Sequence, residues 1–283
     1  MTTTDLVEML DLDEVGPDAW RGHNLRSPGA VVFGGQLLAQ AIAAAAQAAP
    51  GLQLKSMHTV FTRSGLPDQP IDLAVERLHE GRSFATLEVS ARQGDRLCTR
   101  SLVLLHRPDP DLVHHQDGMP DVDGPEQCPP TPTSEGRGWE VRIADGADIF
   151  DPDAIGPAEL RVWSRFDHVP SEPWASQALL GYASDGFLIG TAMRPHAGVG
   201  QAVAHVTIST SVVSQTLTFH DVFDAGEWLL LAQRSPHAGA GRSFGRADVF
   251  TLDGRLVASF AQENMIRAFA TDRQPAPGER AKH

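Results

Sequence analysis

The chain has 283 residues, of which 41% are apolar and 21% charged, an ordinary composition for a globular protein with room for two domains. Its formal net charge of −13 argues against nucleic acid or an anionic membrane as the main partner, because both bind basic surfaces. No stretch approaches the ~18 apolar residues of a membrane span. Cys98 and Cys128 are too few for a disulfide framework and lack metal-ligand spacing. With no leader pattern at the N-terminus, we expect a cytoplasmic protein without a metal or cofactor.

The first half of the chain predicts one helix followed by four strands. The segment "GGQLLAQAIAAAAQAA" (34–49) is apolar on every side, which is typical of a buried helix. Strand patterns follow at 54–63, 70–78, 83–92 and 96–107. Residues 108–137 then contain seven prolines and cannot hold a regular strand or helix for long, so we interpret them as a linker. His114 and His115 lie in this linker, where we do not expect a metal site.

The second half repeats this order. A helix is predicted over 173–185, and strand patterns follow at 212–220, 227–235, 243–249 and 255–267. The four residues "GRSF" occur at 81–84 and again at 241–244, and each copy opens a hairpin that turns through Gly-Asp or Asp-Gly. The recurrence indicates an internal duplication.

The alanine-rich helix predicts the fold of each half. Small side chains between Leu37 and Ala46 let an antiparallel sheet curl closely around the helix, which is the hotdog arrangement. We therefore predict an α+β double hotdog, with domains at 10–107 and 138–270 and the linker at 108–137. The two sheets should pack side by side because exposed sheet edges pair. The alternative is an alanine-rich surface helix in an unrelated α+β domain.

Several longer blocks occur in order over nearly the whole chain. They are "VFGGQLLAQAI" (32–42), "MHTVFTR" (57–63), "GRSFAT" (81–86), "LLGYASD" (179–185), "TFHDVFDAGEWLLL" (218–231) and "GRLVASFAQENMIR" (254–267). Together they resemble the acyl-CoA thioesterase II family. The resemblance implies a double hotdog that hydrolyses acyl-CoA to a fatty acid and CoA and associates at least as a homodimer. It also implies a catalytic Asp at the end of the second helix, a Thr or Ser in the following strand and a Gln in the last strand, which places the Asp at Asp185 and the Gln at Gln262.

The internal repeat gives an independent comparison for these two residues. If Gln36 is matched with Gln177, Asp185 falls opposite Ala44. Gln262 falls opposite Leu102 or Val103. Because an unpaired buried polar group costs about 1–3 kcal/mol, polar residues in one half alone suggest a single site. The alternative is an Asp that caps its helix and a Gln that bonds to backbone.

The hydroxyl position departs from the family pattern. Where the family reads Thr or Ser, an apolar residue and then Asp-His-Ser, this chain reads "VVSQTLTFH", which puts Val212 at the hydroxyl position. Side chains alternate along a strand, so Ser214 has the same side as Val212 and is the preferred candidate. A bulge could bring Ser211 in instead.

A water molecule activated by Asp185 could hydrolyse a thioester without a covalent intermediate. Backbone N–H groups at a helix start, here Gly34, Gly35 and Gln36, could stabilise the oxyanion, although a glycine turn that only lets the chain enter the helix is an equal alternative. CoA phosphates need cations, and Arg63, Arg82 and Arg242 are candidates for this role.

Three other functions fit parts of the sequence. "GRSFG" (241–245) matches the serine hydrolase GxSxG motif at Ser243, but that motif needs a helix after it and a strand pattern follows instead. An acyl-CoA binding protein without catalysis also fits the fold. A hydratase acting on enoyl-CoA should carry an Asp and a His at the helix start, and "SEPWASQALL" has no His.

Overall fold

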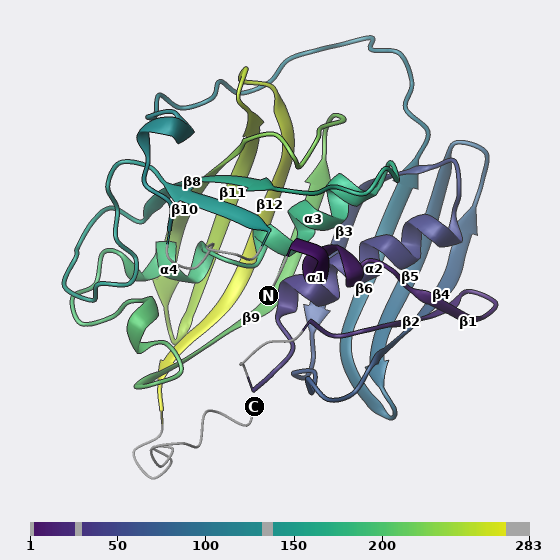
Figure 1. The fold of residues 1–283 in the computed structure, drawn as a ribbon, viewed down its shortest axis with the longest axis horizontal. Helices are drawn as coiled ribbons and strands as arrows, with labels where there is room; N and C mark the ends of the chain where they lie inside the picture. Colours follow the sequence, from purple (N-terminus) through teal and green to yellow (C-terminus); the bar gives the residue numbers. More distant parts are fainter. Residues whose placement is uncertain (1–2, 26–29, 132–137, 270–283) are drawn as a thin grey trace.

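The computed structural model describes residues 3–25, 30–131 and 138–269, and its strands form one curved antiparallel sheet (Figure 1). The strands are β1 (Asp13–Gly16), β2 (Ala19–Gly22), β3 (Gln53–Phe61), β4 (Ile71–Glu80), β5 (Phe84–Gln93), β6 (Arg96–His106), β7 (Trp139–Ile143), β8 (Glu159–Phe166), β9 (Ile208–Phe219), β10 (Leu229–Gly239), β11 (Arg242–Thr251) and β12 (Leu256–Ala268). Their order is β1-β2-β4-β5-β6-β3-β9-β12-β11-β10-β8-β7. Reading outward from the centre, the two halves repeat the same order of strands.

The two halves meet at β3 and β9, in the centre of the sheet. These strands pair antiparallel, with Met57 opposite Leu217 and Thr59 opposite Gln215. The pairing makes one continuous sheet of the two halves and removes the two edges that would otherwise be exposed. The predicted double hotdog with its sheets side by side is therefore confirmed.

Two helices lie against the sheet and against each other (Figure 1). They are α2 (Gly34–Ala48) and α3 (Ala175–Ser184), and nearly all of their residues are buried, as the alanine-rich sequence predicts. Gly181 lies at their contact, where a Cβ would come within 2.8 Å of the Ile42 side chain. The absence of a side chain at this position lets the two helices approach closely.

Shorter elements complete the described fold. They are α1 (Thr3–Glu8), α4 (Leu188–Met193) and the 3₁₀ turns η1 (Pro125–Gln127) and η2 (Gln201–Val203). The sequence patterns did not predict these elements or the strands β1, β2, β7 and β8. The strand pairs β1–β2 and β7–β8 form the two outer edges of the sheet, so the repeat extends further than the predicted hairpins.

The repeated hairpins are confirmed, but the two copies of GRSF do not occupy equivalent positions. In the first hairpin Gly81 bonds to Phe84, so Arg82 and Ser83 form the turn. In the second, Gly239 pairs with Arg242, and the turn is Ala240–Gly241. Counted from the turns, the second motif lies two residues further along its strand than the first. The turns, not the motif, therefore give the correct alignment of the halves.

The proline-rich linker contacts the second half of the sheet. Residues 107–118 are exposed, whereas Cys128 is buried in a small cluster with Trp163, Trp228, Leu230 and Phe250 on the face opposite the helices. The Trp163 indole donates a hydrogen bond to the Asp123 carbonyl oxygen at 2.8 Å. The later part of the predicted linker is thus a covering segment with its own buried contacts.

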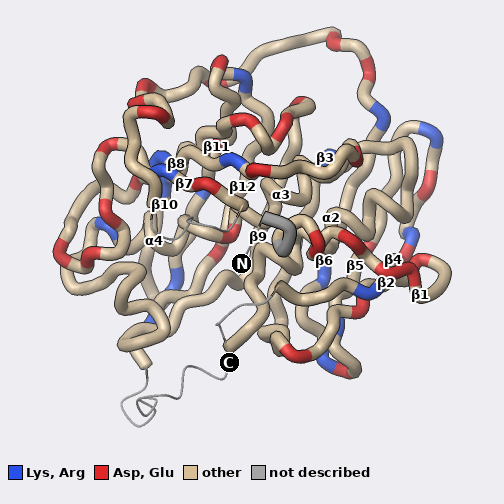
Figure 2. Tube along the Cα trace, viewed as in Figure 1, with Lys and Arg blue, Asp and Glu red and all other residues tan. Residues whose placement is uncertain are grey.

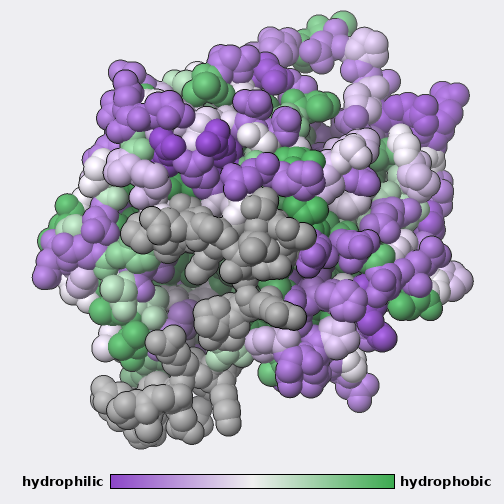
Figure 3. All heavy atoms as spheres, in the orientation of Figure 1, coloured by the Kyte–Doolittle hydropathy of each residue, from purple (hydrophilic) through white to green (hydrophobic). Residues whose placement is uncertain are grey.

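Charged residues of both signs are spread along the described chain (Figure 2). In Figure 2, acidic and basic residues intermingle along loops and strand ends. The face in Figure 3 is mostly hydrophilic, with hydrophobic residues scattered across it. Among the described helices, none is long and apolar enough to cross a membrane.

Candidate active site

Asp185 joins the end of α3 to the start of α2. It is the C-terminal capping residue of α3, and its Oδ2 accepts a hydrogen bond of 3.0 Å from the backbone N–H of Gly35. Phe33, which precedes α2, offers no side-chain cap, so the carboxylate takes that role from the other half of the chain. A Cβ at Gly35 would collide with the Tyr182 carbonyl oxygen, which makes glycine necessary at this crossing.

The surroundings of Asp185 favour its neutral form. Burial raises the pKa of this carboxyl from 3.8 to about 7, and the hydrogen bond from Gly35 opposes that rise only in part. The side chain nevertheless keeps some accessible surface, because it lies in the wall of a cavity. A carboxylate that titrates near neutral pH and reaches a cavity is suited to act as a general base.

Gln262 lies on the inner face of β12, within reach of Asp185. Its Nε2 donates to Asp185 Oδ1 at 3.4 Å and to Gln215 Oε1 at 2.8 Å. Its Oε1 is buried and has no hydrogen-bond partner among the described residues. The structure therefore brings Asp185 and Gln262 together, although Gln262 is buried and does not itself line the cavity that contains Asp185.

The repeat comparison agrees with the structure of both halves. The helices begin at Gly34 and Ala175, so Asp185 corresponds to Ala44. Four residues after each hairpin turn, Leu87 pairs with Val103 and Gly245 pairs with Gln262. Val103 is thus the counterpart of Gln262. Both counterparts are fully buried and apolar, so only one of the two equivalent positions carries a polar constellation.

Ser214 does not join these residues. It pairs with Glu263 on β12 and with Val60 on β3, both exposed, and its hydroxyl donates to Glu263 Oε2 at 3.3 Å. The register shifts by one residue at Val213, since Ser214 pairs with Glu263 but Val212 pairs with Asn264. This bulge reverses the alternation, so the prediction that Ser214 and Val212 share a side is wrong.

The bulge leaves Val212 facing inward, opposite the buried Asn264. Ser211 is exposed but belongs to the wall of the cavity that contains Asp185. Thr210, which the sequence did not predict as a site residue, carries a buried hydroxyl in the same wall. Its Oγ1 lies 3.4 Å from His205 Nε2. Counting two residues back from Val212 would have pointed to it.

Gly34, Gly35 and Gln36 have different surroundings. Gly34 lines the cavity next to Asp185, and a Cβ there would lie 2.8 Å from Asp185 Oδ2. The Gly35 N–H is occupied by that carboxylate. The Gln36 side chain accepts from the Leu25 N–H at 3.0 Å and donates to Asn24 Oδ1 at 2.8 Å. Gln36 therefore holds the segment before α2 in place.

Two cavities meet beside Asp185. One has a volume of about 310 Å³ and a mainly apolar wall that includes Phe33, Trp139, Tyr182 and Phe187. The other, of about 510 Å³, is lined by Asp185 together with Arg63, Arg96, Thr62, Ser64 and His205. Both include Val31, Val32, Phe33, Gly186 and Gln201 in their walls. The apolar cavity and the cavity with basic side chains are therefore neighbours, and their shared wall includes Gly186, the residue that follows Asp185.

Of the three arginines predicted as possible phosphate ligands, one lines a wall of these two cavities and two do not. Arg63 lines the cavity of Asp185, and Arg96, which the sequence reading did not consider, lies beside it and donates to the Ser64 carbonyl oxygen at 2.9 Å. Arg82 lies in the first hairpin turn, and Arg242 is exposed at the start of β11. Neither appears in the walls of these cavities.

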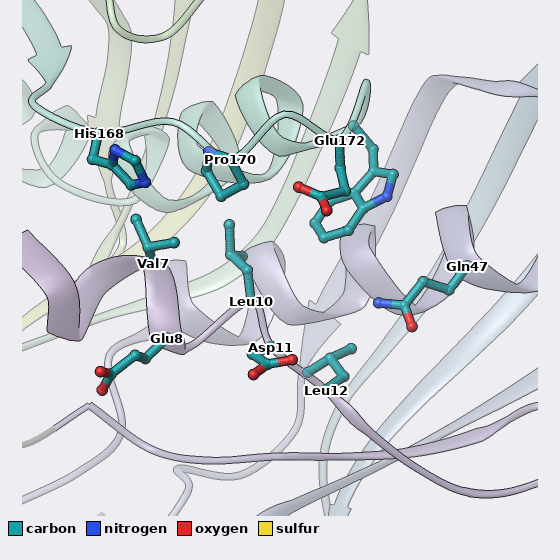
Figure 4. A pocket seen from close by; sticks show the side chains of 10 residues that line it. Val7, Glu8, Leu10, Asp11, Leu12, Gln47, His168, Pro170 and Glu172 are labelled. Atoms are coloured by element: carbon teal, nitrogen blue, oxygen red, sulfur yellow. The ribbon is translucent and has the colours of Figure 1, made fainter.

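A larger cavity, of about 810 Å³, lies at the opposite ends of the two helices (Figure 4). Its wall includes Gln47 from the end of α2 and Trp174, which precedes α3 as Phe33 precedes α2. In Figure 4 the acidic side chains Glu8, Asp11 and Glu172 surround it. An acidic rim disfavours an anionic ligand such as CoA.

Ser243 is not a serine hydrolase nucleophile. It lies within β11, is 3% exposed, and its hydroxyl accepts from Asn264 Nδ2 at 3.3 Å. A nucleophile elbow needs a turn between a strand and a helix, and here the strand continues. The described residues also contain no group of three potential metal ligands.

Comparison with known proteins agrees with this fold over both halves. Residues 23–106 match the acyl-CoA thioesterase N-terminal domain, and residues 119–266 match the acyl-CoA thioesterase C-terminal domain. Acyl-CoA thioesterase 2 of Haemophilus influenzae is 32% identical over 282 residues, covering 93% of this chain and 97% of that protein. Acyl-coenzyme A thioesterase 8 of Homo sapiens is 28% identical over 286 residues, covering 92% and 88%.

Solved structures give the same result. The acyl-CoA thioesterase II of Mycobacterium marinum superposes with a TM-score of 0.79 at 30% identity and covers 93% of this chain and 98% of that one. A protein with a hot dog fold from Alicyclobacillus acidocaldarius has a TM-score of 0.73 at 18% identity, covering 93% and 98%. The chain is therefore a double hotdog protein. With both domains matched over most of its length, it belongs to the acyl-CoA thioesterase II family.

Proposed function

We propose that this protein hydrolyses acyl-CoA thioesters to the free acid and CoA, with Asp185 as general base and Gln262 as its partner. The observation that carries the proposal is the position of Asp185, a carboxyl with its pKa near 7 at the junction of an apolar and a basic cavity. The names of the relatives support the same reaction and substrate class.

The two cavities suit the two parts of the substrate. The apolar space lined by aromatic side chains takes the acyl chain, because burying apolar surface is its main source of binding energy. The adjoining space takes CoA, where Arg63 and Arg96 supply positive charge for its phosphates. This arrangement brings the thioester beside Asp185.

The reaction needs one water and one proton carrier. The ionised Asp185, which accepts a hydrogen bond from Gln262 Nε2, takes a proton from a water in the cavity that it lines. The water oxygen attacks the thioester carbonyl carbon, and the carbon–sulfur bond then breaks. Asp185 returns its proton to the departing CoA sulfur, so the carboxylate is restored.

The oxyanion formed during attack lies near the start of α2 in this proposal. The positive end of the helix dipole and the backbone at Gly34, which lines the cavity, stabilise developing negative charge there. The Gly35 N–H is not available for this purpose while it bonds to Asp185.

The compartment and the assembly are part of the proposal. The free, buried thiols of Cys98 and Cys128 fit a reducing compartment such as the cytoplasm. Association into at least a homodimer follows from the family resemblance. Light scattering at micromolar concentration tests the assembly, and a monomer would contradict it.

Release of free thiol from saturated acyl-CoA substrates tests the function directly. We expect turnover with at least one acyl-chain length. A non-catalytic acyl-CoA binding protein would bind these substrates without releasing thiol. A hydratase would convert an enoyl-CoA to the hydroxyacyl-CoA and leave the thioester intact.

A further inference from the structure

Gln215 on β9 links the two site residues to the backbone of α3. It is 1% exposed and lies directly opposite Gln262, which is equally buried. Its Oε1 accepts from Gln262 Nε2 at 2.8 Å, and its Nε2 donates to Ser184 Oγ. Ser184 in turn donates to the Gly181 carbonyl oxygen at 2.8 Å. Four groups thus form one continuous hydrogen-bonded chain.

The Gly181 carbonyl at one end of this hydrogen-bond network determines which group donates and which accepts in each of its hydrogen bonds. A carbonyl oxygen can only accept, so the Ser184 hydroxyl donates its one hydrogen to Gly181. Its oxygen must therefore accept from Gln215. Gln215 therefore directs its amide nitrogen to Ser184 and its oxygen to Gln262. That oxygen requires the Gln262 nitrogen, and the Gln262 oxygen is left as an acceptor.

The same orientation serves Asp185. The Gln262 nitrogen donates to the carboxylate, whereas a reversed amide would place its oxygen against both Asp185 and Gln215 Oε1. Without Gln215, the longer 3.4 Å hydrogen bond to Asp185 is what still distinguishes the two ends of the Gln262 amide among the described contacts.

The equivalent positions in the first half carry none of these groups. Gln215 pairs with Gln262 as Met57 pairs with Val103, and Ser184 and Asp185 correspond to Ala43 and Ala44. These four counterparts are buried and apolar. The polar groups therefore occur as a set in one half. Burying a polar group costs free energy unless the group is hydrogen-bonded. Four hydrogen-bonded polar groups in one half, with apolar counterparts in the other, therefore indicate that the four groups act together.

We propose that Gln215 is a positioning residue, which together with Ser184 holds the Gln262 amide with its nitrogen toward Asp185, the base of the hydrolytic step. Gln215 thus fixes the orientation of Gln262 at a site where Val212 stands in place of the hydroxyl residue of the family pattern. This inference rests on the proposed hydrolysis and adds a residue that the hydrolytic step itself does not touch.

Gln215→Met tests the inference, since methionine is the residue at the equivalent position of the first half. With an acyl-CoA substrate, kcat should fall about 10- to 100-fold with little change in KM, because misorientation affects the reacting groups more than binding. Ser184→Ala, a smaller change, should lower kcat in the same direction but less.

The matched control is Gln233→Met. Gln233 is a similarly buried glutamine in the same half, and its Oε1 accepts from Thr191 on α4 at 3.2 Å, away from Asp185. Thermal melts of all three variants separate lost stability from lost positioning. Gln233→Met should lower the melting temperature without the drop in kcat.

A pH profile gives a second readout. Losing a donor to the carboxylate disfavours its ionised form, so the acidic limb of kcat against pH should move to higher pH in Gln215→Met and stay in place in Gln233→Met. In the wall of the cavity that contains Asp185, the other titratable or charged side chains are Arg63, Arg96 and His205. None of them changes in these variants.

The outcomes separate this inference from the proposed function. If wild type and Gln215→Met have the same kcat and the same acidic limb while Asp185→Asn is inactive, the positioning role is wrong and the hydrolysis stands. If the wild-type protein releases no thiol from any acyl-CoA, the proposed function itself fails.

Discussion

The backbone N–H of Gly35 and the carboxylate of Asp185 are 150 positions apart in sequence and 3.0 Å apart in the fold. This contact ties the start of the helix in the first half to the end of the helix in the second. The contact is close because Gly34 and Gly35 have no side chains: a Cβ at either position would collide with Asp185 or with the Tyr182 carbonyl oxygen. The first predictions concern this junction.

Asp185→Asn should abolish most activity and preserve the fold. Asparagine keeps an oxygen that can accept from Gly35 but cannot take a proton from water, so turnover should fall by about 10²- to 10⁴-fold. Thiol release under saturating acyl-CoA measures the loss, and circular dichroism checks the fold. Asp253→Asn, an exposed acid in the β11–β12 turn, is the control. Wild-type turnover in Asp185→Asn would show that the base lies elsewhere.

Activity should follow the ionisation of Asp185. Its raised pKa of about 7 means that the base is protonated in acid, so kcat/KM should rise about tenfold per pH unit up to about pH 7 and then level off. Initial rates from pH 5 to 9 test this. A profile that is already flat at pH 5 would contradict a base with this pKa.

The same pKa predicts a difference in stability. Between pH 3.8 and about 7 the folded protein holds a proton on Asp185 that the unfolded chain has lost, so this group contributes stability at low pH that disappears as pH rises through about 7. Asp185→Asn lacks that contribution. Urea unfolding at several pH values should therefore show the variant gaining stability relative to wild type as pH increases from 4 to 7. A constant difference would exclude the effect.

Gly34→Ala should impair catalysis by displacing the carboxylate. The added Cβ would lie 2.8 Å from Asp185 Oδ2 and 3.0 Å from the Phe61 ring, so the side chain of Asp185 must move. We expect kcat to fall by about 100-fold, the usual effect of misplacing a reacting group by about 1 Å. Gly118→Ala is the control, since its Cβ would meet no atom within 4 Å. Equal kcat values for both variants would argue against a tightly held carboxylate.

Arg63→Ala should weaken CoA binding without changing chemistry. Arg63 is exposed in the wall of the cavity beside Asp185, so its loss should raise KM for acyl-CoA and reduce the dependence of KM on salt, with kcat unchanged. Arg82→Ala, in the first hairpin turn outside that wall, should leave KM as it is. The assignment of the phosphates to this cavity is wrong if the two variants have the same KM.

The sequence by itself determined the outline of the fold. Alanine-rich, uniformly apolar helices and alternating strands are local patterns, and hydrophobic burial acts on them in the same way in each half. The family resemblance placed the catalytic pair at Asp185 and Gln262, and the duplication supported it, because apolar residues, Ala44 and either Leu102 or Val103, stand opposite them. Strand pairing then showed that the counterpart of Gln262 is Val103.

The tertiary structure alone decided which side chains face the site. Alternation along β9 is interrupted at Val213 by its pairing with β12, so Ser214 turns outward and Gln215 inward. Such a bulge depends on the register of the partner strand, which no local pattern contains. The repeated GRSF was misleading for the same reason, since the hairpin turn, and not the identity of four residues, determines equivalent positions. Local periodicity predicts elements, whereas the contacts between elements determine the site.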